Sequence, residues 1–127
     1  MMDHPLFYID GAHNVASVTR LVETLEKDFA AKKFHFVIGM MADKDYQMMI
    51  EQVKHLAKTF ILISPDQARG FNPETVGAEL RAEGFQVVVK DNAADVLSYI
   101  KAEIPQEEIV IQFGSLYLVG DIKRLFH

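Results

Sequence analysis

The sequence contains no cysteine among its 127 residues. Disulfide bonds, thiolate metal sites and a cysteine nucleophile are therefore excluded. Long hydrophobic runs are absent as well, because the longest, Phe36 to Ala42, is far shorter than the roughly 18 residues that a membrane-spanning helix needs. No N-terminal stretch combines a basic head with an apolar core, so we expect no secretory signal. These absences predict a soluble, cytoplasmic domain without a membrane partner.

Basic residues are also few, 13 against 18 acidic ones, and the formal net charge is −5. A negative domain gains nothing from the counterion release that drives binding to a nucleic-acid backbone, so we expect no DNA or RNA partner.

The five histidines lack the i, i+4 spacing of a helical zinc site, and we predict no metal site in the chain. Half of the residues are hydrophobic and 24% are charged, a globular composition that fits a single domain over residues 1–127.

Short apolar runs alternate with segments of helical periodicity about five times along the chain. The predicted strands are Leu6–Ile9, Phe34–Met40, Phe60–Ile63, Phe85–Val89 and Ile109–Phe113. Apolar spacings of three, four and seven predict helices within residues 15–29, 49–57, 73–83, 91–100 and 118–125. Parallel strands need crossover connections, and these are right-handed. The pattern therefore predicts a three-layer, Rossmann-like α/β domain with a mostly parallel sheet of five or six strands and helices on both faces.

Polar residues gather where the first predicted strand ends, in Asp10-Gly11-Ala12-His13-Asn14. In open parallel sheets, ligands bind outside the carboxyl ends of the strands, where helix N-termini present free amides. Asn14 is suited to cap the following helix, and the positive end of the helix dipole favours a neutral His13. Asp10 could accept a hydrogen bond from a ribose hydroxyl or a cationic side chain. The alternative is a turn whose polar groups only satisfy backbone amides.

Two further strand ends carry candidate residues. Lys44 follows the second strand and falls in a first helical turn, where the helix dipole disfavours a cation. An anionic ligand would explain this lysine, although Asp43 and Asp45 could simply neutralise it. Ser115 follows Gly114 at the end of the fifth strand and could bind a ligand or serve as an ordinary N-cap.

These motifs, in this order and at these strand ends, resemble a known family. The stretches Asp10 to Asn14, Gly39 to Asp45 and Gly114 to Gly120 are similar to the C-terminal domain of folylpolyglutamate synthase, which in many bacteria is also dihydrofolate synthase, in the Mur ligase superfamily. The resemblance extends from about Pro5 to Phe126. It implies an ATP-dependent ligase that adds L-glutamate to a folate through an acyl phosphate.

The resemblance also implies roles for residues and partners. Asp10, His13 and Asn14 would lie at the nucleotide, and Lys44 and Ser115 would bind carboxylate oxygens of the incoming glutamate. ATP and Mg²⁺ would be bound mainly by an N-terminal ATPase domain that this chain lacks. The partners would then be that domain, glutamate and folate, and the chain alone would be inactive.

Val15 departs from the family pattern, which usually has proline after the His-Asn pair. Two other functional classes stay open. The chain could be the C-terminal domain of a cell-wall Mur ligase, with the same fold and a different substrate. It could also be a receiver-like or other non-catalytic binding module, although a receiver needs a lysine at the end of the fifth strand, where this chain has Gly114 and Ser115.

Overall fold

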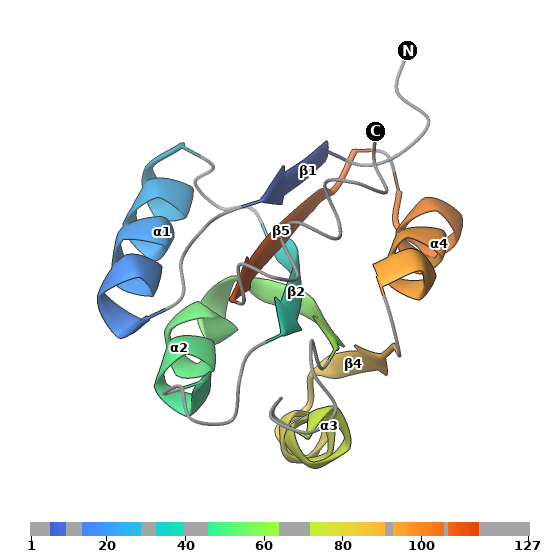
Figure 1. Ribbon diagram of the computed structural model, residues 1–127. Helices are drawn as coiled ribbons and strands as arrows, with labels where there is room; N and C mark the ends of the chain where they lie inside the picture. The colour runs from blue at the N-terminus through green and yellow to red at the C-terminus, as the bar shows by residue number, and fades with distance from the viewer. Residues whose placement is uncertain are drawn as a thin grey trace.

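A computed structural model of the chain describes residues 6–9, 14–28, 33–39, 46–63, 72–90, 93–105 and 107–114. Strands and helices alternate along it (Figure 1). The strands are β1 Leu6–Ile9, β2 Phe34–Gly39, β3 Ala57–Leu62, β4 Gln86–Val89 and β5 Ile109–Gly114. The helices are α1 Val15–Asp28, α2 Tyr46–Val53, the short 3₁₀ helix η1 Lys54–Leu56, α3 Pro73–Ala82 and α4 Ala93–Glu103. The predicted helix within residues 118–125 lies outside the described residues.

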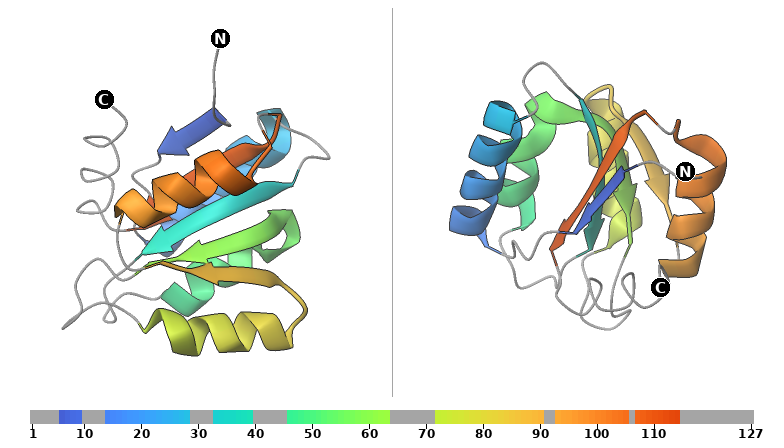
Figure 2. Two further views of the ribbon diagram at one scale, coloured as in Figure 1. Left: turned by 90° about the vertical axis from the view of Figure 1, so that its right-hand side faces the viewer. Right: turned by 90° about the horizontal axis from the view of Figure 1, so that it is seen from above.

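The five strands form one sheet in the order β1-β5-β2-β3-β4, and every pair of neighbours is parallel. Helices α1, α2 and α3 contribute to one hydrophobic core on one side of the sheet, which we call face 1. Helix α4 packs on the opposite side, face 2 (Figure 2). The predicted three-layer α/β fold with helices on both faces is therefore confirmed.

Local sequence signals account for α3 and β2. The side chain of Asn72 accepts hydrogen bonds from the backbone N–H groups of Glu74 and Thr75, and Pro73 occupies the first helical turn. Gly84 follows the helix with φ of 99°, a conformation that favours glycine. All six residues of β2 are buried, as the continuous apolar run predicts for a strand covered on both sides.

The second predicted helix is wrong at its C-terminal end. The apolar spacing continues from Val53 to Ala57, but α2 ends at Val53 and Ala57 is the first residue of β3. Ala57 has an extended backbone and pairs with Phe34 in the parallel ladder. Pairing with a neighbouring strand therefore outweighs the local helical pattern, and β3 begins three residues earlier than predicted.

Candidate functional site

The carboxyl ends of β1, β5 and β2 lie next to one another at one edge of the sheet, which we call the carboxyl edge. Gln112 of β5 is in register with Ile9 of β1 and with Val37 of β2, and Gly114 is in register with Gly39. The three sequence motifs continue the chain directly from these three strand ends. Strand order therefore brings their starting points together, although the motifs are far apart in the sequence.

Of the predicted site residues, the structure describes only Asn14. Its side-chain Oδ1 accepts a hydrogen bond from the backbone N–H of Ser17 at 2.8 Å, and its carbonyl oxygen accepts from Val18 N–H at 3.0 Å. The predicted capping role of Asn14 is confirmed. Its role at a nucleotide stays a prediction.

The other four candidates, Asp10, His13, Lys44 and Ser115, lie outside the described residues. Their assignment to nucleotide and glutamate therefore stays a prediction as well. The strand ends beside them, Ile9, Gly39 and Gly114, are described and are adjacent in the sheet.

Paired glycines leave the carboxyl edge without side chains where β2 meets β5. Gly39 and Gly114 are direct register partners, so neither strand contributes a Cβ at this point. No side chain of these two residues therefore limits how closely another group can approach the two backbones. Two residues earlier on the same face of β5 lies Gln112, a fully buried amide that the sequence analysis did not single out.

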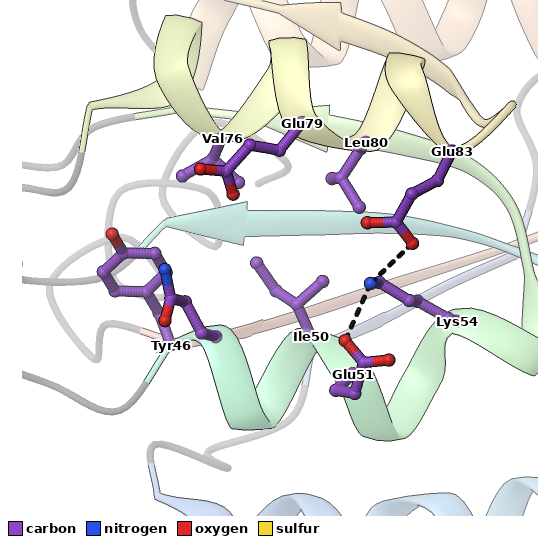
Figure 3. A pocket seen from close by; sticks show the side chains of 9 residues that line it. Tyr46, Ile50, Glu51, Lys54, Val76, Glu79, Leu80 and Glu83 are labelled. Atoms are coloured by element: carbon purple, nitrogen blue, oxygen red, sulfur yellow. Dashed lines mark hydrogen bonds and ion pairs between the residues drawn. The ribbon is translucent and has the colours of Figure 1, made fainter.

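A separate furrow lies between α2 and α3, with a cavity volume of about 200 Å³. Ile50, Val76 and Leu80 contribute apolar side chains to it, with Tyr46 at one end (Figure 3). At the other end, Lys54 Nζ donates hydrogen bonds to Glu51 Oε2 and Glu83 Oε1, each at 2.7 Å.

The hydrogen bonds from Lys54 to Glu51 and Glu83 raise the pKa of Lys54, although burial opposes them. Lys54 is therefore held as a cation between two carboxylates and does not offer a neutral amine that could act as a base or a nucleophile. Sequence spacing indicates the pair of Glu51 with Lys54, but the pair with Glu83 depends on how α2 and α3 pack.

A third polar cluster lies at the opposite, amino edge of the sheet. His35 of β2 is 5% exposed, and its Nε2 is 2.6 Å from Glu108 Oε1. Lys58 of β3 donates to Glu108 Oε2 at 2.7 Å. A carboxylate is only an acceptor, so Nε2 of His35 carries the proton in this contact. The cluster joins β2, β3 and the segment before β5, away from the carboxyl edge.

The cluster at Glu108 predicts a dependence of stability on pH. Hydrogen bonds from Lys58 and then from His35 hold the pKa of Glu108 below its ordinary value. A group with a depressed pKa in the folded state stabilises the protein above its unfolded pKa, and this contribution is lost as the pH falls through the folded pKa. We expect Glu108→Gln to lower the free energy of unfolding by about 1 kcal/mol at neutral pH. The difference should shrink as the pH falls below the ordinary pKa of a glutamate and vanish only once the lowered pKa of Glu108 in the folded state has been passed.

The measurement is urea unfolding of the chain across this pH range. Glu107→Gln is the matched control, because Glu107 is the exposed neighbour of Glu108. A Glu108→Gln protein whose loss of stability is equal at neutral and at acidic pH would contradict the assignment.

The fold and its carboxyl edge define the class of protein: a three-layer α/β domain in which neighbouring strand ends meet at the edge where open parallel sheets generally bind ligands. Residues 2–116 match the family described as Mur ligase, glutamate ligase domain. The chain belongs to this family.

Relatives with known names refine the comparison. The chain is 30% identical over 126 residues to dihydrofolate synthase/folylpolyglutamate synthase of Bacillus subtilis, covering 98% of this chain and 28% of that protein. It is 32% identical over 122 residues to folylpolyglutamate synthase of Lacticaseibacillus casei, covering 96% of this chain and 27% of that protein. The chain thus spans less than a third of the length of these relatives. The predicted resemblance to the folate branch of the superfamily is confirmed.

Solved structures share the fold. A Mycobacterium tuberculosis folylpolyglutamate synthase complexed with ADP matches with a TM-score of 0.78 at 20% identity, over 94% of this chain and 29% of that one. A bifunctional folylpolyglutamate synthase/dihydrofolate synthase from Yersinia pestis, complexed with AMPPNP and a Mn ion, matches with a TM-score of 0.79 at 20% identity, over 97% of this chain and 29% of that one.

Proposed function

We propose that this chain is the C-terminal domain of an ATP-dependent ligase that adds L-glutamate to a folate. One observation carries the proposal: nearly the whole chain aligns with the Bacillus subtilis synthase at 30% identity. In the proposed reaction, a folate carboxylate is activated as an acyl phosphate. The amino group of glutamate then attacks the acyl carbon, and phosphate leaves as the amide bond forms.

Lys44 and Ser115 are proposed to bind the carboxylates of the incoming glutamate. A lysine ammonium and a serine hydroxyl are both donors, and a carboxylate is purely an acceptor. The strands that lead to the two residues are direct neighbours, because Gly39 of β2 is in register with Gly114 of β5. This adjacency supports a shared site at the carboxyl edge.

Asp10, His13 and Asn14 are proposed to lie at the nucleotide. They follow β1, the other neighbour of β5, and Asn14 caps the N-terminus of α1. The Oδ1 atom of Asn14 is already bonded to Ser17 N–H, so its side-chain contribution to a ligand would be its Nδ2 donors. The N-terminus of α1 adds partial positive charge, which suits an anionic ligand.

ATP and Mg²⁺ are proposed to bind mainly to an N-terminal ATPase domain outside this chain. The described residues contain no group of three or more histidine or acidic side chains that could hold a metal ion. That domain would be the chain's main protein partner, and ATP would supply the phosphoryl group. No described helix is long and apolar enough to cross a membrane, and we propose a cytoplasmic location for the whole protein.

The test uses the full-length protein encoded by the gene that contains this chain. We expect ATP hydrolysis and amide formation when glutamate and a folate acceptor are both present. The 127-residue chain alone should be inactive, because orientation by the second domain supplies much of the rate. Activity with a muramyl acceptor instead of folate would assign the protein to cell-wall synthesis. A gene without an upstream phosphate-binding loop would contradict the ligase assignment altogether.

A further inference from the structure

The furrow between α2 and α3 combines an apolar floor with an acidic rim. Ile50, Val76 and Leu80 form the floor, and none of them is more than 5% exposed. Four charged residues line the rim, three acidic and one basic: Glu51, Glu79, Glu83 and Lys54. The charged lining therefore has a formal net charge of −2, and it complements a cation.

One end of the furrow already binds a cation that is carried on an apolar stem. The Nζ atom of Lys54 lies between Glu51 of α2 and Glu83 of α3, 2.7 Å from a carboxylate oxygen of each. Only 17% of the Lys54 side chain is exposed. Its methylene stem is therefore largely covered, while its ammonium is bound by carboxylates from both helices.

The same arrangement of acceptors recurs one helical turn nearer the start of both helices. Helices α2 and α3 run in the same direction (Figure 3), so a step of four residues on each moves about one turn back along the furrow. Four residues before Glu51 is Gln47, and four residues before Glu83 is Glu79. Both Gln47 and Glu79 line the furrow. An amide oxygen and a carboxylate thus replace the two carboxylates of the first site.

This second turn of the furrow has acceptors but no cation of its own. The residue four positions before Lys54 is Ile50, an apolar residue of the floor. Within the residues that the structure describes, no hydrogen bond or ion pair involves the Gln47 amide or the Glu79 carboxylate. The cavity of about 200 Å³ thus offers a cation the same surroundings as the Lys54 site, with the cation left to come from another molecule.

We propose that the furrow at Gln47 and Glu79 binds the side chain of an arginine presented by a partner protein. A planar guanidinium can form two parallel hydrogen bonds with the Glu79 carboxylate and has further N–H donors for the amide oxygen of Gln47. The methylene stem of the arginine would cover the apolar floor. A cavity of about 200 Å³ is smaller than the roughly 300–1,000 Å³ of small-molecule sites, and it suits one side chain. The inference is independent of the proposed ligase function.

The experiment titrates the 127-residue chain, which has a hydrophobic core of its own on each face of the sheet, with N-acetyl-arginine amide. We expect saturable shifts in the amide NMR signals of α2 and α3, with a Kd on the order of 1 mM for so small a ligand. N-acetyl-citrulline amide has a similar shape but no charge and should bind at least about tenfold more weakly. N-acetyl-lysine amide should also bind more weakly, because an ammonium cannot form the paired hydrogen bonds.

Substitutions locate the site. Glu79→Gln should weaken binding of the arginine probe at least about fivefold, because it removes the charged acceptor. Gln47→Leu should weaken it about two- to fivefold, the effect of one neutral hydrogen bond. Glu74→Gln is the matched control, because Glu74 is an exposed glutamate of the same helix that does not line the furrow, and its affinity should equal that of the wild type.

Three results would overturn the proposal: no saturable binding of the arginine probe, equal affinity for the citrulline probe, and unchanged affinity in Glu79→Gln. Equal affinity for the lysine probe would overturn the assignment to arginine. Free arginine distinguishes a protein partner from the free amino acid, because its carboxylate would face the acidic rim and should weaken binding. Tighter binding of free arginine than of the blocked probe would contradict a protein partner.

Discussion

Lys44→Ala in the full-length protein is expected to raise the KM for glutamate roughly 10- to 100-fold and to change kcat much less. The estimate follows from the proposed charged hydrogen bond between Lys44 and a glutamate carboxylate, since such a bond is worth about 1.5–3 kcal/mol. A residue that holds the substrate equally well before and during the reaction affects mainly KM. The measurement is the initial rate of amide formation as a function of glutamate concentration, at saturating ATP and folate.

Two companion variants sharpen this test. Ser115→Ala removes a neutral donor, so its glutamate KM should rise only about two- to tenfold. Lys101→Ala removes an exposed lysine from the last turn of α4 and should behave as the wild type. If Lys44→Ala left both the glutamate KM and kcat unchanged, Lys44 would not bind the substrate.

The elements of the fold that were predictable are those with local causes. The cap at Asn72, the proline at position 73 and the stop at Gly84 act within a few residues, and α3 begins and ends where these signals place it. The strands β1 and β2 follow from their composition alone. By contrast, Ala57 continues a helical pattern and yet belongs to β3. It pairs with Phe34, which is distant in sequence, so the local pattern does not predict this strand residue.

The candidate site depends on the order of the strands in the sheet, and the hydrophobic periodicity of the sequence does not predict that order. Alternation of strands and helices predicts a parallel sheet, but it does not say that β5 inserts between β1 and β2. That insertion makes the three motif-bearing strand ends neighbours. Spacing alone does not predict which strand ends are neighbours, and each motif could equally be an ordinary turn or helix cap. The candidate site residues therefore follow from the resemblance to a known family.

The sequence also does not predict which side chains of distant elements contact one another. The contacts of Glu108 with His35 and Lys58 bridge 73 and 50 residues of sequence. The burial of Gln112 likewise follows from its position in a central strand. The sequence does offer one signal for it, since a glutamine interrupts the apolar run of residues 109–113.

Aromatic side chains pack across the central strands on face 1, and Phe36 takes part in three of these ring contacts. Its side chain is 0% exposed. Its ring centroid lies 6.2 Å from that of Phe60 on β3 and 6.0 Å from that of Phe113 on β5. Phe34 on the same strand is also 6.0 Å away. The cluster therefore joins the three central strands β5, β2 and β3.

Phe36→Ala is expected to lower the free energy of unfolding of the chain by about 3–5 kcal/mol, because it removes a buried ring and leaves a cavity. This is a large part of the 5–15 kcal/mol that is typical of a domain. Urea unfolding of the 127-residue chain measures the change. Phe36→Leu is the matched control and should lose less, since leucine refills much of the space. A loss below about 1 kcal/mol for Phe36→Ala would show that the contacts of Phe36 with Phe60 and Phe113 do not hold the central strands together.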